Sequence, residues 1–183
     1  MSTLPTIVNA LEADDALHLG RIIVLIDAFS GKKGDQEIVG LTKLAKLDFL
    51  LRYPAYLERA LRARGADEAA SKVQEYERSS VEARMVRFRF GPWDHRYRRF
   101  LNTLSAKHLI TVSDARRTVV IGQTEQGREA AQRLLRQEEF AVLRLRATLL
   151  KRYLDLSATN LMEFIYETFP EISTMRLGET ITQ

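Results

Sequence analysis

Residues 84–128 read RMVRFRFGPWDHRYRRFLNTLSAKHLITVSDARRTVVIGQTEQGR, and this stretch decides the fold. Its first part alternates strictly between apolar residues and arginines, in the order Val86, Arg87, Phe88, Arg89 and Phe90. A period of two predicts a half-buried strand whose arginines face solvent or a ligand. Gly91-Pro92 then turns the chain, and Pro92 is well placed as the first residue of a helix.

A basic helix is predicted from Trp93 to Lys107. At about 100° per residue, one side collects five residues that should pack into the core: Trp93, Tyr97, Phe100, Leu101 and Leu104. The opposite side and one flank carry His95, Arg96, Arg98, Arg99, Asn102 and Lys107. Arginine and asparagine can pair bidentately with guanine and adenine edges in the major groove. The same side chains also suit phosphates or an acidic protein surface, so the helix predicts a recognition face without choosing its ligand.

A β-hairpin follows the basic helix. Residues 109–112 and 118–121 are rich in β-branched side chains and are joined by a short polar loop. Arg116 and Arg117 at its tip suit contact with phosphate or the minor groove, although they could equally keep an exposed hairpin soluble. Thr124 is in position to cap a further helix that runs to about Gln137. This order predicts a mainly α (α+β) winged helix, with the hairpin as its wing and additional C-terminal helices.

The remaining chain reads as helices joined by short breaks, predicted over residues 16–29, 41–51, 54–64, 140–154 and 158–169. We therefore expect a flexible arm over residues 1–13 and a winged-helix domain over residues 14–137, with a polar insert at about 66–80. A C-terminal helical appendage should follow over residues 138–170, and a tail over residues 171–183.

The C-terminal helices carry more apolar surface than a compact winged helix can cover. Their stripe includes Leu143, Leu149, Tyr153, Leu161, Phe164 and Ile165. These side chains either pack back on the domain or form the interface with a partner or a second copy. We take them as the candidate partner interface.

Positive charge is concentrated in the middle of the chain. Residues 84–117 contain nine Arg or Lys against Asp94 and Asp114, a net charge of +7 within a chain whose total is +4. A basic cluster on a winged helix is the electrostatic footprint expected for duplex DNA, the alternative being a merely solvated face. The candidate DNA-binding residues are Arg87, Arg89, His95, Arg96, Arg98, Arg99, Asn102, Lys107, Arg116 and Arg117.

Catalysis by this chain is not expected. The three histidines, His18, His95 and His108, have no metal-ligand spacing, and the chain has no cysteine. No serine lies in a G-x-S-x-G elbow, and the adjacent carboxylate pairs lie next to helix starts, where capping explains them. We therefore expect no metal or cofactor. The lack of cysteine, of a secretory signal and of a long apolar run favours a cytoplasmic protein without a membrane segment.

Four segments carry a family resemblance: GLTKLAKLDFLLRYP (40–54), MVRFRFGPWDHRYRRFLNTLSAKHLI (85–110), TEQGREAAQRL (124–134) and LKRYLDLSATNLMEFIYETFPEI (150–172). Together they resemble the small middle components of bacterial ABC three-component systems, including the accessory subunits of Lamassu-type anti-phage defence. The resemblance implies a non-catalytic winged-helix subunit that holds duplex DNA and docks onto an SMC-like ATPase or an effector such as a nuclease. No catalytic motif of that family is carried over.

Two other functions remain open. A dimeric transcription regulator of the MarR or PadR kind would pair two copies through the C-terminal helices and read half-sites one helical turn apart. Against it, residues 52–92 separate the second helix from the basic one, whereas a compact helix-turn-helix joins them by a short turn. A purely protein-binding adaptor would use the same basic face for an acidic partner.

Overall fold

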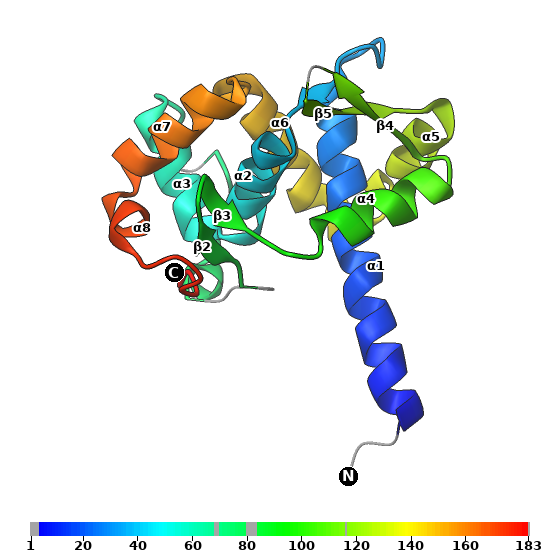
Figure 1. The fold of residues 1–183 in the computed structure, drawn as a ribbon, viewed down its shortest axis with the longest axis horizontal. Helices are drawn as coiled ribbons and strands as arrows, with labels where there is room; N and C mark the ends of the chain where they lie inside the picture. Colours follow the sequence, from blue (N-terminus) through cyan, green and yellow to red (C-terminus); the bar gives the residue numbers. More distant parts are fainter. Residues whose placement is uncertain (1–3, 68–69, 80–83, 116, 183) are drawn as a thin grey trace.

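The computed structural model describes residues 4–67, 70–79, 84–115 and 117–182. Within them the chain is mainly helical, with a three-stranded and a two-stranded antiparallel sheet (Figure 1). The helices are α1 (Leu4–Phe29), α2 (Leu41–Arg52), α3 (Pro54–Ala63), α4 (Tyr97–Ala106), α5 (Glu125–Leu135), α6 (Ala141–Leu154), α7 (Ala158–Thr168) and α8 (Pro170–Thr174). The strands are β1 (Ile38–Val39), β2 (Val86–Phe88), β3 (Gly91–Trp93), β4 (Ile110–Ala115) and β5 (Thr118–Gln123). None of these helices has the length and apolarity required to cross a lipid bilayer.

Helix α1 is the centre of the molecule. Its residues from Ile22 to Ile26 are at most 2% exposed, and it lies between α4 and α5 on one side and α2 and α6 on the other (Figure 1). The sequence predicted a helix from Ala16 preceded by a flexible arm. The chain is instead helical from Leu4 onward, so the described part of that arm continues the same helix beyond the other elements.

The larger sheet has the order β1-β5-β4 and is antiparallel throughout. β4 and β5 form the predicted hairpin, and the short β1 adds to its inner edge by pairing Ile38 with Ile121. Ile38, Ile110 and Ile121 point into the core and are at most 2% exposed. The sheet therefore joins the hairpin firmly to the start of α2.

Thr124 caps α5 as predicted. Its hydroxyl accepts a hydrogen bond from the Gly127 amide at 3.0 Å and donates one to the His108 carbonyl at 2.7 Å. Gly127 replaces the usual capping-box glutamate because a Cβ there would lie 1.8 Å from the carbonyl oxygen of Leu109. Glycine thus lets α5 pack directly against the start of the hairpin.

The C-terminal helices are part of the same core and do not form an appendage. α6 packs on α1, α2 and α3, while α7 packs on α2, α3 and β3. Phe49 of α2 and Tyr56 of α3 meet Phe169 at the end of α7, with ring centroids 6.5 and 4.8 Å away. One apolar cluster therefore extends from α1 to the end of the chain.

The residues after α8, predicted to be a tail, return to the molecule. Thr180 pairs with Val86 of β2, and the Ile181 amide donates to the Met85 carbonyl at 2.9 Å. The Ile181 side chain is fully buried, and its carbonyl accepts a hydrogen bond from the Tyr53 hydroxyl at 3.0 Å. The end of the chain thus completes the edge of the β2–β3 hairpin.

Candidate nucleic-acid interface

Helix α4, the centre of the candidate interface, begins later than the sequence predicted. Gly91–Trp93 forms a strand that pairs with β2, so Trp93 precedes the helix instead of opening it. The turn between strand and helix is held by Asp94, whose carboxylate accepts a hydrogen bond from the Arg96 amide at 2.9 Å. Because of the strand pairing and this side-chain hydrogen bond, the helix begins at Tyr97.

The two sides of α4 differ as expected from its sequence. The inward side consists of Tyr97, Phe100, Leu101 and Leu104, each at most 4% exposed. Arg98 and Asn102 lie on the exposed side, and His95 is exposed in the turn before the helix. The inward side anchors the helix, so the exposed side is presented on a rigid support.

Besides Arg99, which pairs with Asp15, six predicted DNA-binding residues are exposed to solvent: Arg89, His95, Arg98, Asn102, Lys107 and Arg117. Arg116 lies outside the described residues. Among the residues that the structure describes, Arg98, Lys107 and Arg117 meet no carboxylate within ion-pair distance. Their charges are therefore available to an external anion.

The other three predicted arginines are engaged within the molecule. Arg87 donates to the Ile172 carbonyl at 3.1 Å and lies over the ring of Tyr166, so it holds β2 to the C-terminal helices. Arg96 bonds the carboxylate of Asp94, and Arg99 pairs with Asp15 of α1 at 2.7 Å. Strand alternation and helical periodicity placed Arg87 and Arg99 outward but could not identify their partners on distant segments, whereas the partner of Arg96 lies only two residues before it.

A chain of buried ion pairs lies beneath α4. The carboxylate of Asp48 in α2 contacts Arg21 of α1 at 2.6 Å and Arg52 at 2.7 Å. Arg52 then reaches the Asp94 carboxylate at 2.7 Å, and the Tyr97 hydroxyl donates to Asp48 at the same distance. We call Arg21, Asp48, Arg52, Asp94 and Tyr97 the buried polar network. It connects α1, α2 and the start of α4, so it fixes how α4 is presented.

The network is stable in its charged form. Burial alone would raise the pKa of Asp48, but Arg21 and Arg52 outweigh this effect and hold it below its usual range. Burial would also raise the pKa of Asp94, yet hydrogen bonds from Arg96 and Arg52 keep it at about 2. Burial and the Asp48 charge raise the pKa of the Tyr97 phenol well above its ordinary value. Near neutral pH both carboxylates are therefore ionised and the phenol is protonated.

The β4–β5 hairpin projects beside α4. Residues 111–115 of β4 are exposed, while Val120 and Ile121 of β5 hold the base of the hairpin in the core. Arg117 at the turn has a φ of 69°, a left-handed conformation that suits a tight hairpin turn. The hairpin therefore carries at least one exposed cation at the end furthest from the core.

The predicted partner-interface residues lie mostly inside the molecule. Leu161 and Ile165 are fully buried, and Leu143, Leu149, Tyr153 and Phe164 pack partly buried against the same core. The surface that they could offer to a second chain is covered by α1, α2 and α3 of their own chain. Of the two interpretations of this stripe, the structure thus shows packing back on the domain.

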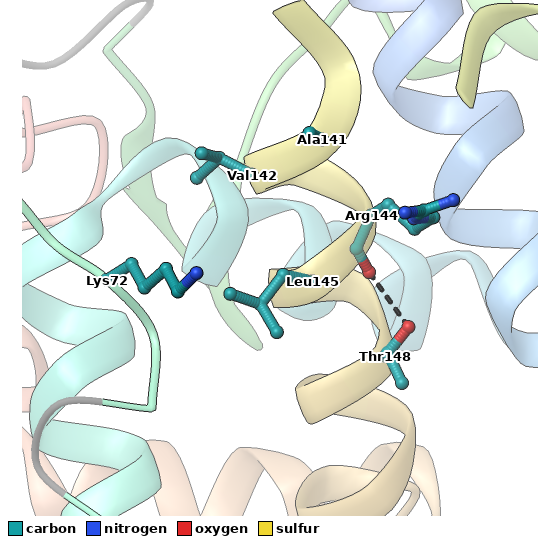
Figure 2. A pocket seen from close by; sticks show the side chains of 6 residues that line it. All are labelled: Lys72, Ala141, Val142, Arg144, Leu145 and Thr148. Carbon is teal, nitrogen blue, oxygen red and sulfur yellow. Dashed lines mark hydrogen bonds between the residues drawn. The ribbon is translucent and has the colours of Figure 1, made fainter. Parts of the chain in front are cut away.

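The outer side of α6 is open instead. Figure 2 shows a hollow of about 420 Å³ lined by Lys72, Ala141, Val142, Arg144, Leu145 and Thr148. Lys72 reaches toward Leu145 from across the hollow, and Val142 is 41% exposed. An aliphatic strip of Ala141, Val142 and Leu145, flanked by charged and polar side chains, therefore lies on the surface of α6, where the sequence had predicted a different set of apolar residues.

The histidines are dispersed. His18 is buried against Phe100 and contacts Arg21, whereas His95 and His108 are exposed. In the part of the chain that the structure describes, no three histidine or carboxylate side chains are placed to hold a metal ion together.

The buried polar network was missed at the sequence level. The available signal was the pair Asp48 and Arg52, four residues apart within the otherwise apolar segment LDFLLR, because opposite charges at this spacing meet on one face of a helix. Arg21 gave a second signal, since it precedes the aliphatic run of the central helix. Charged residues at core positions of two helices indicate a mutual ion pair.

Comparison of the chain with protein-family models, with curated proteins and with solved structures gives no significant match.

Proposed function

We propose that this chain is a non-catalytic winged-helix subunit that binds the backbone of duplex DNA through α4 and the β4–β5 hairpin. Support comes from the order α1, β1, α2, α4, β4, β5 and from the antiparallel β1-β5-β4 sheet. A winged helix would have this connectivity, and we interpret α3 and the β2–β3 hairpin as an insert before the proposed recognition helix. The insert packs on α2 and α7, away from the exposed side of α4.

The observation that carries the proposal is the placement of uncompensated cations on α4 and the hairpin. Arg98 and Lys107 are exposed on and just beyond α4, and Arg117 lies at the hairpin turn. Exposed cations on a helix and an adjoining wing are suited to contacts with duplex phosphates, and such contacts release counterions on binding. Arg99 adds to this surface only if it leaves Asp15, which makes it a weaker contributor.

Backbone binding is favoured over the reading of base sequence. Within α4, the exposed Arg98 and Asn102 have side chains suited to base edges, and they lie on adjacent turns of a short helix. Two such contacts give little discrimination, whereas phosphate contacts hold any sequence. We therefore expect binding that depends strongly on salt and weakly on sequence.

The resemblance to Lamassu-type accessory subunits supplies the proposed partner, an SMC-like ATPase or its effector. We place the docking surface on the outer side of α6, where Val142 and Leu145 line the open hollow. The alternative of a MarR- or PadR-like dimer is disfavoured because the C-terminal stripe that would pair two copies is buried within one chain.

The test of DNA binding is the affinity for a 20-base-pair duplex, measured by fluorescence anisotropy across a salt series. The wild-type chain should show a steep loss of affinity with salt, and Arg98→Ala and Arg117→Ala should each reduce the slope by about 1. Arg152→Ala, on the exposed side of α6, is the matched control and should change nothing. A salt-independent affinity, or an equal effect of all three variants, contradicts the proposal.

The test of docking is co-purification of an SMC-like ATPase with the tagged chain from its native cell. Val142→Glu should abolish co-purification without changing DNA affinity, because it places a charge in the aliphatic strip. Leu177→Glu, at an equally apolar residue that is 67% exposed in the C-terminal segment, is the control. Recovery of the chain only as a dimer would favour the regulator instead.

A further inference from the structure

A second hollow, of about 280 Å³, lies between α2, α7 and the turn of the β2–β3 hairpin. It is lined by Thr42, Lys46, Phe90, Ala158, Thr159 and Met162. None of these residues belongs to α4, to the β4–β5 hairpin or to the outer side of α6. The hollow is therefore separate from both proposed interfaces.

Lys46 is the unusual residue of this hollow. It is 1% exposed, and its ammonium donates to the Thr42 carbonyl at 3.1 Å. Among the described residues no carboxylate lies within ion-pair distance of it, in contrast to Lys43 on the same helix, which pairs with Asp155 at 2.7 Å. A buried ammonium without a counter-ion is costly. Burial accordingly lowers the pKa of Lys46 from its ordinary value to about 8, which still leaves it mostly protonated at neutral pH.

The backbone around Lys46 adds positive potential. The hollow is bordered by the first turns of both α2 and α7, through Thr42 and through Ala158 and Thr159. The two helix starts are adjacent, since a Cβ on Gly40 would lie 3.5 Å from that of Ala158. α2 has no side-chain cap, and its N-cap residue Gly40 accepts through its carbonyl from the Lys43 and Leu44 amides, which lie beyond the first two residues of the helix. Helix N-termini favour an anion at this position.

The remaining walls are apolar. Phe90 is 51% exposed at the turn of the β2–β3 hairpin, and Met162 and Ala158 face it from α7. Gly91 has a φ of +116°, and a Cβ added there would lie 3.5 Å from Lys46 Cε, so the hairpin turn packs next to the Lys46 side chain. A single cation beneath apolar walls suits a monoanion with a short hydrocarbon or aromatic part better than a polyphosphate, for which a fork of arginines would be expected.

We propose that this hollow binds a small organic carboxylate, with its charged end on Lys46 and its apolar part against Phe90 and Met162. The bound carboxylate supplies the counter-charge that the protein itself lacks at Lys46. The site does not depend on DNA binding, so either proposal can fail without the other.

The test is a titration of the full-length, ¹⁵N-labelled protein with benzoate, followed by NMR. Saturable shifts should appear at the amides of Thr42, Lys46 and Thr159. Benzyl alcohol, which has the same ring without the charge, and inorganic phosphate, which has charge without the ring, should each bind at least 10-fold more weakly. Equal binding of benzyl alcohol or of phosphate, or the absence of saturable shifts with benzoate, overturns the proposal.

Two variants test the site by independent means. Lys46→Met keeps the length of the side chain and should weaken benzoate binding at least 10-fold, whereas Lys33→Met, at an exposed lysine, should not. Thr159→Trp should block the hollow by volume while leaving the charge of Lys46 in place. Loss of binding in both supports the site, and retention in either one overturns it. Unchanged ¹⁵N amide shifts at residues far from the hollow show that each variant remains folded.

Discussion

The hydroxyl of Tyr97 donates a hydrogen bond of 2.7 Å to the fully buried carboxylate of Asp48. This bond joins the middle of α2 to the first residue of α4, and Asp48 also holds Arg21 and Arg52. The buried ion pairs of Asp48 therefore fix the position of α4 and of its exposed side.

Asp48→Asn should destabilise the fold strongly. The change leaves two buried guanidinium groups without their shared counter-charge, a situation that costs about 3–5 kcal/mol. Tyr97→Phe removes one hydrogen bond and should cost about 1–2 kcal/mol. Urea unfolding measures both free energies. Asp114→Asn, at an exposed residue of β4, is the control and should lie within about 0.5 kcal/mol of wild type. A change in the free energy of unfolding as small as that of Asp114→Asn would show that Asp48 does not fix the position of α4.

The two carboxylates of the network should make stability depend on acid pH. Their pKa values are lower in the folded state, with Asp94 at about 2, so the stabilisation is complete above the unfolded value near 4. It is lost as the pH falls from about 4 through the folded values. Urea midpoints at pH 7, 4 and 2.5 measure this loss. Asp94→Asn should lower stability at pH 7 and flatten the profile, and an unchanged slope would contradict the assignment.

Lys46 should make stability depend on pH in alkaline solution. Its pKa is lowered by folding, so the folded state binds fewer protons than the unfolded state between about pH 8 and the ordinary value of 10.5. Local stability therefore rises with pH over that window, by at most about 3 kcal/mol. Lys46→Met should remove this rise and stabilise the protein at pH 7. The measurement is thermal unfolding of wild type and variant between pH 7 and 10. The same dependence of stability on pH in both would show that burial of the Lys46 ammonium does not destabilise the fold.

Arg96 and Arg98 should respond differently to the same substitution. Arg98→Ala should reduce the salt slope of DNA binding and leave stability within about 0.5 kcal/mol, because its side chain is exposed. Arg96→Ala should lower stability, since its guanidinium completes the shell of Asp94 at 3.0 Å. The two variants are compared by urea unfolding and anisotropy in parallel. A loss of stability in Arg98→Ala together with a reduced salt slope in Arg96→Ala would contradict this assignment.

Ile181→Ala should cost about 2–5 kcal/mol, because the side chain is fully buried at the edge of the β2–β3 hairpin. Leu177→Ala, at a residue that is 67% exposed in the same segment, should have almost no effect. Thermal unfolding of the two variants distinguishes a docked C-terminus from a loosely attached one.

The long amphipathic elements could be predicted from the sequence because their periodicity is set by burial of one face. The helices around Leu47, Leu57, Leu150 and Leu161 and the β4–β5 hairpin all lie within a few residues of their predicted ranges. Thr124 also caps α5 as its position indicated.

The errors fall where distant segments decide the structure. Phe88 and Phe90 alternate like core residues yet are 43% and 51% exposed, because β2 pairs with only β3 and the C-terminal segment. Trp93 matched the helical period, but pairing with Val86 draws it into a strand. The partners of Arg87 and Arg99 likewise lie on distant elements that their local patterns do not reveal.

The docking of Thr180 and Ile181 on the β2 edge has a consequence for how the molecule is made. Ile181 follows Tyr53 by 128 residues, so the hydroxyl of Tyr53 lacks its acceptor and the hairpin edge stays open until this late segment has been synthesised and has docked. Folding of this half therefore waits for residues far along the chain. A tag or fusion placed directly after residue 183 would follow a segment that is part of the core, whereas the N-terminal end of α1 lies away from it.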